Sequence, residues 1–237
     1  MADSAPTAVA GPTAPTTDAA TTAVPTTRWT ALVGTLLYLL ELVFLFGLWS
    51  APPAGLSAGD LVDFWGSNAG MHAFAAAGVS VAVLGRIVFA AAVRDALRAA
   101  PGVRVIADIG LALAVASVAI EITLMTVGSG VGVVGAADEN AAVLAAGIVG
   151  LGQAGTGVPI AMGASGILLS VAMLRTRLVP AWISVVGLLG GIAFAALLVA
   201  PLPGLTAIAT PIALLALVLV VVWMLATSIV FARRAAL

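Results

Sequence analysis

The sequence predicts an all-α membrane protein, a polytopic bundle of six transmembrane helices with both termini in the cytoplasm. Of the 237 residues, 62% are hydrophobic and only 8% are charged, whereas a soluble globular domain is about 25% charged. Six apolar segments follow one another along the chain, each near or above the roughly 20 residues that cross a bilayer core. Arginines gather at alternate ends of these segments. Together these observations exclude a soluble domain.

The predicted spans are separated by short polar or glycine-rich connections. They lie at 29–50, 71–93, 105–127, 150–174, 181–200 and 205–231. Residues 1–27 are rich in Ala, Thr and Pro, which is typical of a disordered tail, so 28–234 forms the transmembrane domain. The glycine-rich stretch 128–158 leaves the number of helices open. It fits an outer helix at 139–149 that leads into the fourth span, and it also fits a seventh or re-entrant element.

The charges between the spans predict the orientation of the helices. Eight of the nine arginines lie at the same set of ends: Arg28, Arg94, Arg98, Arg104, Arg175, Arg177, Arg233 and Arg234. The opposite ends carry Asp60, Asp63, Asp138 and Glu139 and no arginine. The positive-inside rule then places both termini in the cytoplasm. The many alanines and the absence of lysine indicate a GC-rich bacterial genome, and we therefore expect a bacterial plasma (inner) membrane protein.

The first outer connection predicts a short helix at the membrane surface. Ser57 followed three residues later by Asp60 is the pattern of a helix N-cap. Leu61, Phe64 and Trp65 would then face the lipid.

Ionisable residues inside spans are rare and are functional-site hypotheses by default. Here they are Glu41, His72, Arg86, Asp108 and Glu121. Depths estimated from the helical rise of about 1.5 Å per residue put Arg86 level with Asp108, and His72 level with Glu121. The sequence thus predicts a structural ion pair, Arg86–Asp108. Two interpretations of the remaining groups stay open: a proton or ion path, or interhelical contacts that only hold the bundle together.

Glu41 stands out because it lies near the middle of the first span. Tyr38 shares its helix face and could hold the carboxyl group, while Gly34 would let another helix pack closely. The candidate intramembrane polar site is therefore Glu41, Tyr38, His72 and Glu121.

Small residues in the fourth and fifth spans predict close helix packing. They are Gly155, Gly163, Gly166, Ser170, Gly187 and Gly191. Pro159 would kink the fourth span or mark its start. Broken helices line substrate sites in transporters, but in ordinary bundles they are packing features.

Residues 163–166 read GASG, which resembles the G-x-S-G motif of rhomboid intramembrane serine proteases. That resemblance would make Ser165 a nucleophile and requires a histidine in the sixth span, where this sequence has none. The only histidine is His72, and we place it about 10 Å away in depth, too far for a catalytic pair. One histidine and no cysteine do not supply a zinc site. We therefore expect no catalytic residues, no metal and no cofactor.

Three stretches carry a resemblance to a known family: LLYLLELVFLFGLW, GDLVDFWGSNAG and GILLSVAMLRTRLVPAWISVVGLLGGIAF. They resemble a family of bacterial multi-pass membrane proteins that is described only as a domain of unknown function. The resemblance covers about 28–234 and implies an integral membrane bundle. It implies no activity, cofactor or catalytic residue.

Two functional classes follow from the sequence. The favoured one is a non-enzymatic membrane component that binds a partner, senses lipid or assembles. The alternative is a small transporter or channel that is proton-coupled through Glu41. Expected partners are the lipid bilayer and either further copies of this chain or another membrane protein. The net charge of −1 predicts no binding to nucleic acid. A cavity that reaches Glu41 would favour the transporter.

Overall fold

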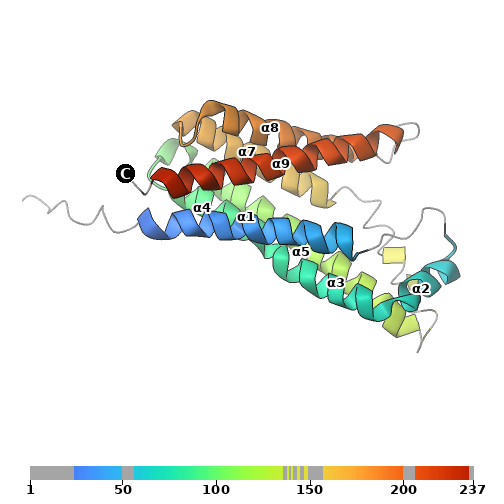
Figure 1. Cartoon of the computed structure of the whole chain (residues 1–237). Helices are drawn as coiled ribbons and strands as arrows, with labels where there is room; N and C mark the ends of the chain where they lie inside the picture. The colour runs from blue at the N-terminus through green and yellow to red at the C-terminus, as the bar shows by residue number, and fades with distance from the viewer. Residues whose placement is uncertain are drawn as a thin grey trace, which may run out of the picture.

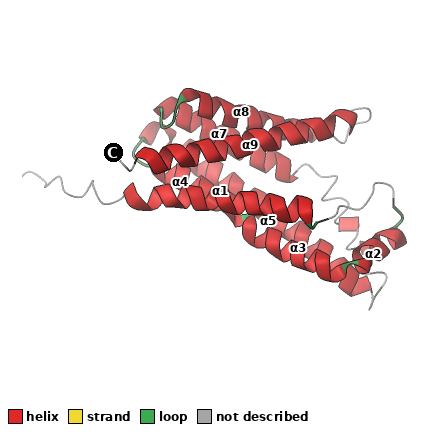
Figure 2. Cartoon of the chain, viewed as in Figure 1, coloured by secondary structure: helices red, strands yellow, loops and turns green. Residues whose placement is uncertain are grey.

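The computed structural model describes residues 24–49, 56–135, 138, 140, 143–144, 147–148, 157–199 and 206–234. All regular structure in these ranges is helical (Figure 2). Residues 1–23 of the predicted tail at 1–27 lie outside the described residues. Residues 24–27 belong to the first helix. Residues 128–135 continue the third span as helix. Of the outer helix expected at 139–149, only 140, 143–144 and 147–148 are described, and these are helical.

The described helices follow the predicted spans, but the second is broken, the third is longer at both ends, the fourth begins later and the fifth is short. They are α1 (Val24–Gly47), α2 (Ala58–Ser67), α3 (Ala69–Ala82), α4 (Leu84–Ala96), α5 (Pro101–Gly135), α7 (Gly157–Thr176), α8 (Ala181–Ala196), the short 3₁₀ helix η2 (Leu197–Val199) and α9 (Thr206–Arg234). The second span is broken into α3 and α4. The fifth, α8, has only 16 residues, so five stretches are long and apolar enough to cross a membrane. The chain therefore has the helices of a multi-pass membrane protein.

The six main helices form a closed ring in chain order. Helix α1 packs on α4, α4 on α5, α5 on α7, α7 on α8, α8 on α9, and α9 again on α1. Helix α3 extends α4 and packs on α1 and α5. Helix α1 begins and α9 ends at the same end of the bundle (Figure 1), which we call the terminal end; the other is the distal end.

Glycines let the helices of this ring approach each other to backbone contact. A Cβ atom on Gly85 of α4 would lie 2.5 Å from the carbonyl oxygen of Gly34 of α1. A Cβ atom on Gly163 of α7 would lie 2.6 Å from the carbonyl oxygen of Gly191 of α8. Both predicted close approaches are confirmed. Pro159 is the third residue of α7, so it marks the start of the fourth span and does not kink it.

The predicted N-cap of α2 is confirmed, but the prediction that its aromatic face is exposed to lipid is wrong. The Ser57 hydroxyl accepts a hydrogen bond from the backbone N–H of Asp60. Trp65 is only 1% exposed, and its ring lies 4.9 Å from that of Trp49. The reason is the length of α5, which continues to Gly135 and offers α2 a surface to cover.

Candidate functional site

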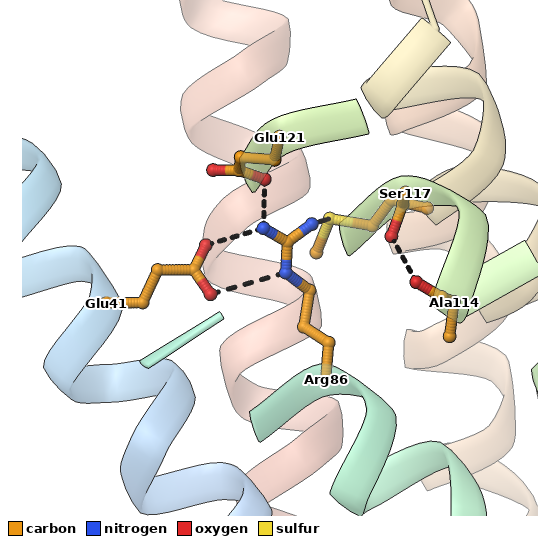
Figure 3. A network of polar contacts seen from close by, with 6 residues as sticks. Glu41, Arg86, Ala114, Ser117 and Glu121 are labelled. Atoms are coloured by element: carbon orange, nitrogen blue, oxygen red, sulfur yellow. Dashed lines mark hydrogen bonds and ion pairs between the residues drawn. The ribbon is translucent and has the colours of Figure 1, made fainter. Parts of the chain in front are cut away.

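Three ionic side chains from three helices meet inside the ring (Figure 3). Arg86 of α4 donates from Nη2 to Glu41 Oε1 of α1 at 2.8 Å and from Nε to Glu41 Oε2 at 3.3 Å. The same Nη2 also donates to Glu121 Oε2 of α5. All three residues are buried, at 3% exposed for Glu41, 6% for Arg86 and 8% for Glu121. We call this group the ionic cluster.

The ionic cluster corrects the predicted pairing of Arg86 with Asp108. Depth estimates compare Cα positions, but helical side chains tilt toward the N-terminus of their own helix. Helix α4 runs toward the terminal end, so Arg86 tilts toward the distal end. Helix α5 runs the opposite way, so Glu121 tilts toward Arg86 and Asp108 tilts away from it.

Asp108 lies instead in a separate arginine cluster at the terminal end. Its Oδ1 lies 2.6 Å from Arg94 Nε, and its Oδ2 lies 3.9 Å from Arg104 Nε. These side chains are between 34% and 62% exposed. Exposed pairs of this kind contribute about 0–1 kcal/mol, so Asp108 is not part of the buried site.

His72 does not pair with Glu121. It lies in an aromatic group at the distal end, where its ring centroid is 4.8 Å from that of Trp65 and 5.8 Å from that of Trp49. Its Nδ1 lies 3.3 Å from the carbonyl oxygen of Trp65. The imidazole therefore ties α3 to α2 and is separate from the ionic cluster.

Tyr38 is buried beside the ionic cluster, but Glu41 is held by Arg86 instead. Among the described residues, no hydrogen bond joins the Tyr38 hydroxyl to Glu41. The structure thus brings together Glu41, Tyr38 and Glu121 of the predicted polar site and adds Arg86 in place of His72.

A pocket of about 340 Å³ reaches the ionic cluster. Tyr38, Glu41, Arg86 and Glu121 form its polar end. The remaining walls are largely apolar: Leu42, Leu45, Phe46, Val158, Met162, Phe194, Thr210, Ala213, Leu214 and Leu217. Two of these side chains are more than half exposed, Phe46 of α1 at 65% and Leu214 of α9 at 53%. The pocket is therefore open where α1 and α9 separate.

The same two helices are joined closer to the terminal end. The Thr35 hydroxyl of α1 lies 2.8 Å from the Ser228 hydroxyl of α9. It also donates a hydrogen bond to the carbonyl oxygen of Ala31, one turn earlier in α1, at 3.0 Å. This contact fixes α1 on α9 on one side of the pocket. The opening is thus a local feature of the distal half of the seam.

On the other side of Arg86 the ring is closely packed. The cavity there measures about 30 Å³ and is lined by side chains that include Phe89, Leu169, Trp223 and Met224. A space of this size admits no more than about two water molecules. The pocket therefore reaches the ionic cluster from one side, and packed side chains close the other.

The charge of the ionic cluster is unbalanced. One guanidinium faces two carboxyl groups, and both oxygens of Glu41 accept from it. Glu121 contacts Arg86 through Oε2 alone, and its second oxygen points away from the guanidinium (Figure 3). Within the described part of the chain that oxygen has no hydrogen-bond partner. Glu121 is thus the carboxyl group with unused acceptor capacity.

Ser165, the serine of the GASG motif, makes a hydrogen bond between two helices. Ser165 of α7 donates from Oγ to the carbonyl oxygen of Gly110 of α5 at 2.8 Å, and His72 lies in the aromatic group described above. The structure does not bring the two residues of a protease pair together. In the described ranges, no group of three or more His, Cys, Asp and Glu side chains is placed to hold a metal ion.

Sequence reasoning missed the α7 and α9 walls of the pocket. Arg86 Nη1 contacts Met162 Sδ at 3.6 Å, and Leu214 and Leu217 of α9 line the same pocket as Glu41. Apolar residues in an apolar span carry no signal of this kind. The Arg86–Glu121 contact depends on side-chain tilt and on the rotation of each helix about its axis, and the Cα depths used for the sequence prediction contain neither.

Comparisons with known proteins give no relatives. No protein-family model matches the chain. No curated protein matches it, and no solved structure does. The resemblance to a bacterial family of unknown function stays a prediction.

Proposed function

We propose that this protein is a small proton-coupled membrane transporter that binds its substrate in the pocket between α1 and α9. The single observation that carries the proposal is the pocket of about 340 Å³ that reaches a buried cluster of two carboxyl groups and one guanidinium. Ligand pockets are typically about 300–1,000 Å³, largely apolar, with a few convergent polar groups. The sequence favoured a non-enzymatic component that binds a partner, senses lipid or assembles, because the apolar spans hold few polar groups with which to line a path.

The charge imbalance supplies the coupling. With both carboxyl groups ionised the ionic cluster carries one excess negative charge inside an apolar ring, which is unfavourable. A proton on one carboxyl group removes this charge, and so does a bound ligand of opposite charge. Occupation by one disfavours the other, and this mutual exclusion is what an exchanger requires.

The arrangement of the ring supports a two-sided mechanism. Large side chains close the ring on the terminal side of Arg86, whereas α1 and α9 are separated on the distal side. Transport to the terminal end requires α7, α8 and α9 to move relative to α1, α4 and α5. The ionic cluster belongs to the second group of helices, so its geometry can persist while its access changes.

We further propose six membrane crossings with both termini in the cytoplasm of a bacterium. Helix α8 and η2 together extend from Ala181 to Val199, which is close to the length of about 20 residues that a crossing needs. Helix α8 also occupies one position in the ring. An even number of crossings agrees with the common end of α1 and α9 (Figure 1). The arginines near that end support its cytoplasmic orientation.

Proteoliposomes that enclose a pH-sensitive dye test the transporter. Gradients of three solute classes are imposed in turn: an organic monocation, an organic monoanion and a neutral amphiphile. We expect at least one gradient to drive proton movement through the full-length protein. Glu41→Gln and Glu121→Gln should abolish that movement, because either substitution removes the excess charge.

Asp108→Asn is the matched control for this experiment. It also neutralises a carboxylate on α5, but one in the half-exposed arginine cluster, and it should transport like the unmodified protein. Proton movement that is no faster than in protein-free liposomes for all three classes would contradict the proposal. Unchanged transport by both glutamine variants would do so as well.

A second candidate function is a rigid membrane component in which the ionic cluster is purely structural. The observation that favours it is that Arg86 links α1, α4 and α5 while its Nη1 contacts α7. In that case all solute gradients leave the internal pH unchanged, and charge removal changes stability alone.

A further inference from the structure

We propose that the ligand of the pocket is a lipophilic organic monocation, which enters from the lipid through the seam between α1 and α9 and displaces a proton from the ionic cluster. This inference rests on the proposed function and specifies its substrate class. Three independent features of the pocket carry it: its charge, the chemistry of its walls and the position of its opening.

The charge selects a cation. Arg86 contributes one positive charge and Glu41 and Glu121 two negative charges, and the described lining holds no other charged side chain. The titratable groups that face Glu121 are Arg86 from α4 and Glu41 and Tyr38 from α1. Helices α3, α7, α8 and α9 contribute none to the described lining. One positive charge on a ligand therefore neutralises the deprotonated ionic cluster, and an anionic ligand would add to its excess.

The free acceptor places that charge near Glu121. Both oxygens of Glu41 already accept from Arg86, but Glu121 has one oxygen directed away from the guanidinium (Figure 3). A cation at this oxygen lies on the side of Glu121 away from Arg86, which reduces repulsion between the two positive charges. A cation held there competes with a proton for the excess negative charge of the ionic cluster.

The walls select an organic cation over an inorganic one. A small metal cation needs about six oxygen ligands or retained water, and this pocket is mostly aliphatic. Three aromatic rings line it, those of Tyr38, Phe46 and Phe194, and such rings attract organic cations through their faces. Leucine side chains complete a surface suited to an apolar ligand body.

The opening selects a ligand that partitions into lipid. The rim of the pocket carries Phe46 and Leu214, both more than half exposed, on the outward surfaces of two helices that are apolar enough to cross a membrane. A ligand approaching from the bilayer would meet apolar side chains first and the carboxyl groups last. A strongly hydrated ligand would have to lose its water before reaching any polar partner.

Binding to the purified full-length protein tests the inference with two probes of equal shape and opposite charge. Tetraphenylphosphonium is the cation and tetraphenylborate the anion, and triphenylphosphine oxide is a neutral comparison. We expect saturable binding of the phosphonium in equilibrium dialysis, with about one proton released per cation bound. Binding should tighten as the pH rises, because protons and the cation compete for the excess negative charge of the ionic cluster.

Two variants examine the site itself. Glu121→Gln should weaken phosphonium binding at least about tenfold. Ala213→Trp should fill the pocket from α9 without altering any charge and should weaken binding similarly, even if the glutamine variant folds poorly. Val218→Trp is the matched control, because Val218 is 57% exposed on the same helix and does not line the pocket.

The outcomes separate this inference from the proposed function. Equal binding of the borate or the neutral oxide would overturn it, and so would phosphonium binding that neither Glu121→Gln nor Ala213→Trp weakens. If the phosphonium does not bind but an anion or neutral solute drives protons in the liposomes, the substrate class is wrong and the transporter proposal stands. If the phosphonium binds with proton release but no solute gradient moves protons, the site is correct and the transporter proposal is wrong.

Discussion

Replacing Arg86 by leucine is expected to destabilise the bundle by about 3–5 kcal/mol, the usual effect of removing one partner from a buried ion pair. The substitution leaves Glu41 and Glu121 facing each other inside an apolar ring with no positive charge between them. Arg86 also connects three helices, so its loss should loosen their packing. Unfolding of the purified protein by sodium dodecyl sulfate, followed by tryptophan fluorescence, measures the change.

A triple variant tests whether this loss comes from uncompensated charge. Glu41→Gln, Arg86→Met and Glu121→Gln together remove all three charges at nearly constant volume, and such replacements of buried ionic groups are often neutral or stabilising. We expect stability to recover to within about 1 kcal/mol of the unmodified protein, while proton-coupled transport stays lost. A triple variant that remains as unstable as Arg86→Leu would contradict this explanation.

The control for both variants is Asp108→Asn. Depth matching alone makes Asp108 the partner of Arg86 and predicts similar damage from either substitution. The structure predicts a small effect, up to about 1 kcal/mol, because the Arg94–Asp108 pair is partly exposed. Equal destabilisation by Arg86→Leu and Asp108→Asn would show that the observed pairing is wrong.

Substituting the glycines at the helix crossings should have the second large effect. In Gly85→Ala the new methyl group would lie 2.5 Å from a backbone oxygen of α1, and in Gly163→Ala it would lie 2.6 Å from a backbone oxygen of α8. A backbone atom cannot rotate away, so the helices must separate. Overpacking of this kind costs about 1–3 kcal/mol, which the same unfolding measurement would detect.

Gly130→Ala provides the comparison for these two variants. Gly130 also lies inside a helix, α5, but a Cβ atom there would meet nothing within 4 Å. Alanine is the better helix former by up to about 1 kcal/mol, so this variant should be neutral or slightly more stable. Losses of equal size in all three variants would mean that helix contact is not the cause.

Much of the fold could be predicted from composition and periodicity. Apolar segments near the length of a bilayer core follow from hydropathy alone, and five of them are helices of sufficient length in the structure. The N-terminus of α2 was predictable because a capping pattern is local: Ser57 and Asp60 contact each other within one turn. Close packing at Gly34, Gly163 and Gly191 was predictable because only glycine permits backbone contact between helices.

The candidate site was predictable in its members but not in its connections. Glu41, Arg86 and Glu121 stand out as ionisable residues in apolar spans, and that signal requires no structure. Which of them meet depends on side-chain tilt and on the rotation of each helix about its axis, and Cα depth contains neither quantity. His72 illustrates the same point, since it lies at a plausible depth for Glu121 but faces α2.

The sequence by itself determined that this chain forms apolar helices and which few ionisable residues lie within them, but not that α5 continues to Gly135 or that α7 begins only at Gly157. The tertiary structure alone decided that these helices close into a ring, that Arg86 bridges Glu41 and Glu121, and that α1 and α9 separate at the distal end to leave a pocket beside them. The physical reason is that helix formation and bilayer-length hydrophobicity are properties of consecutive residues. A pocket exists only where non-consecutive surfaces fail to fill the space between them.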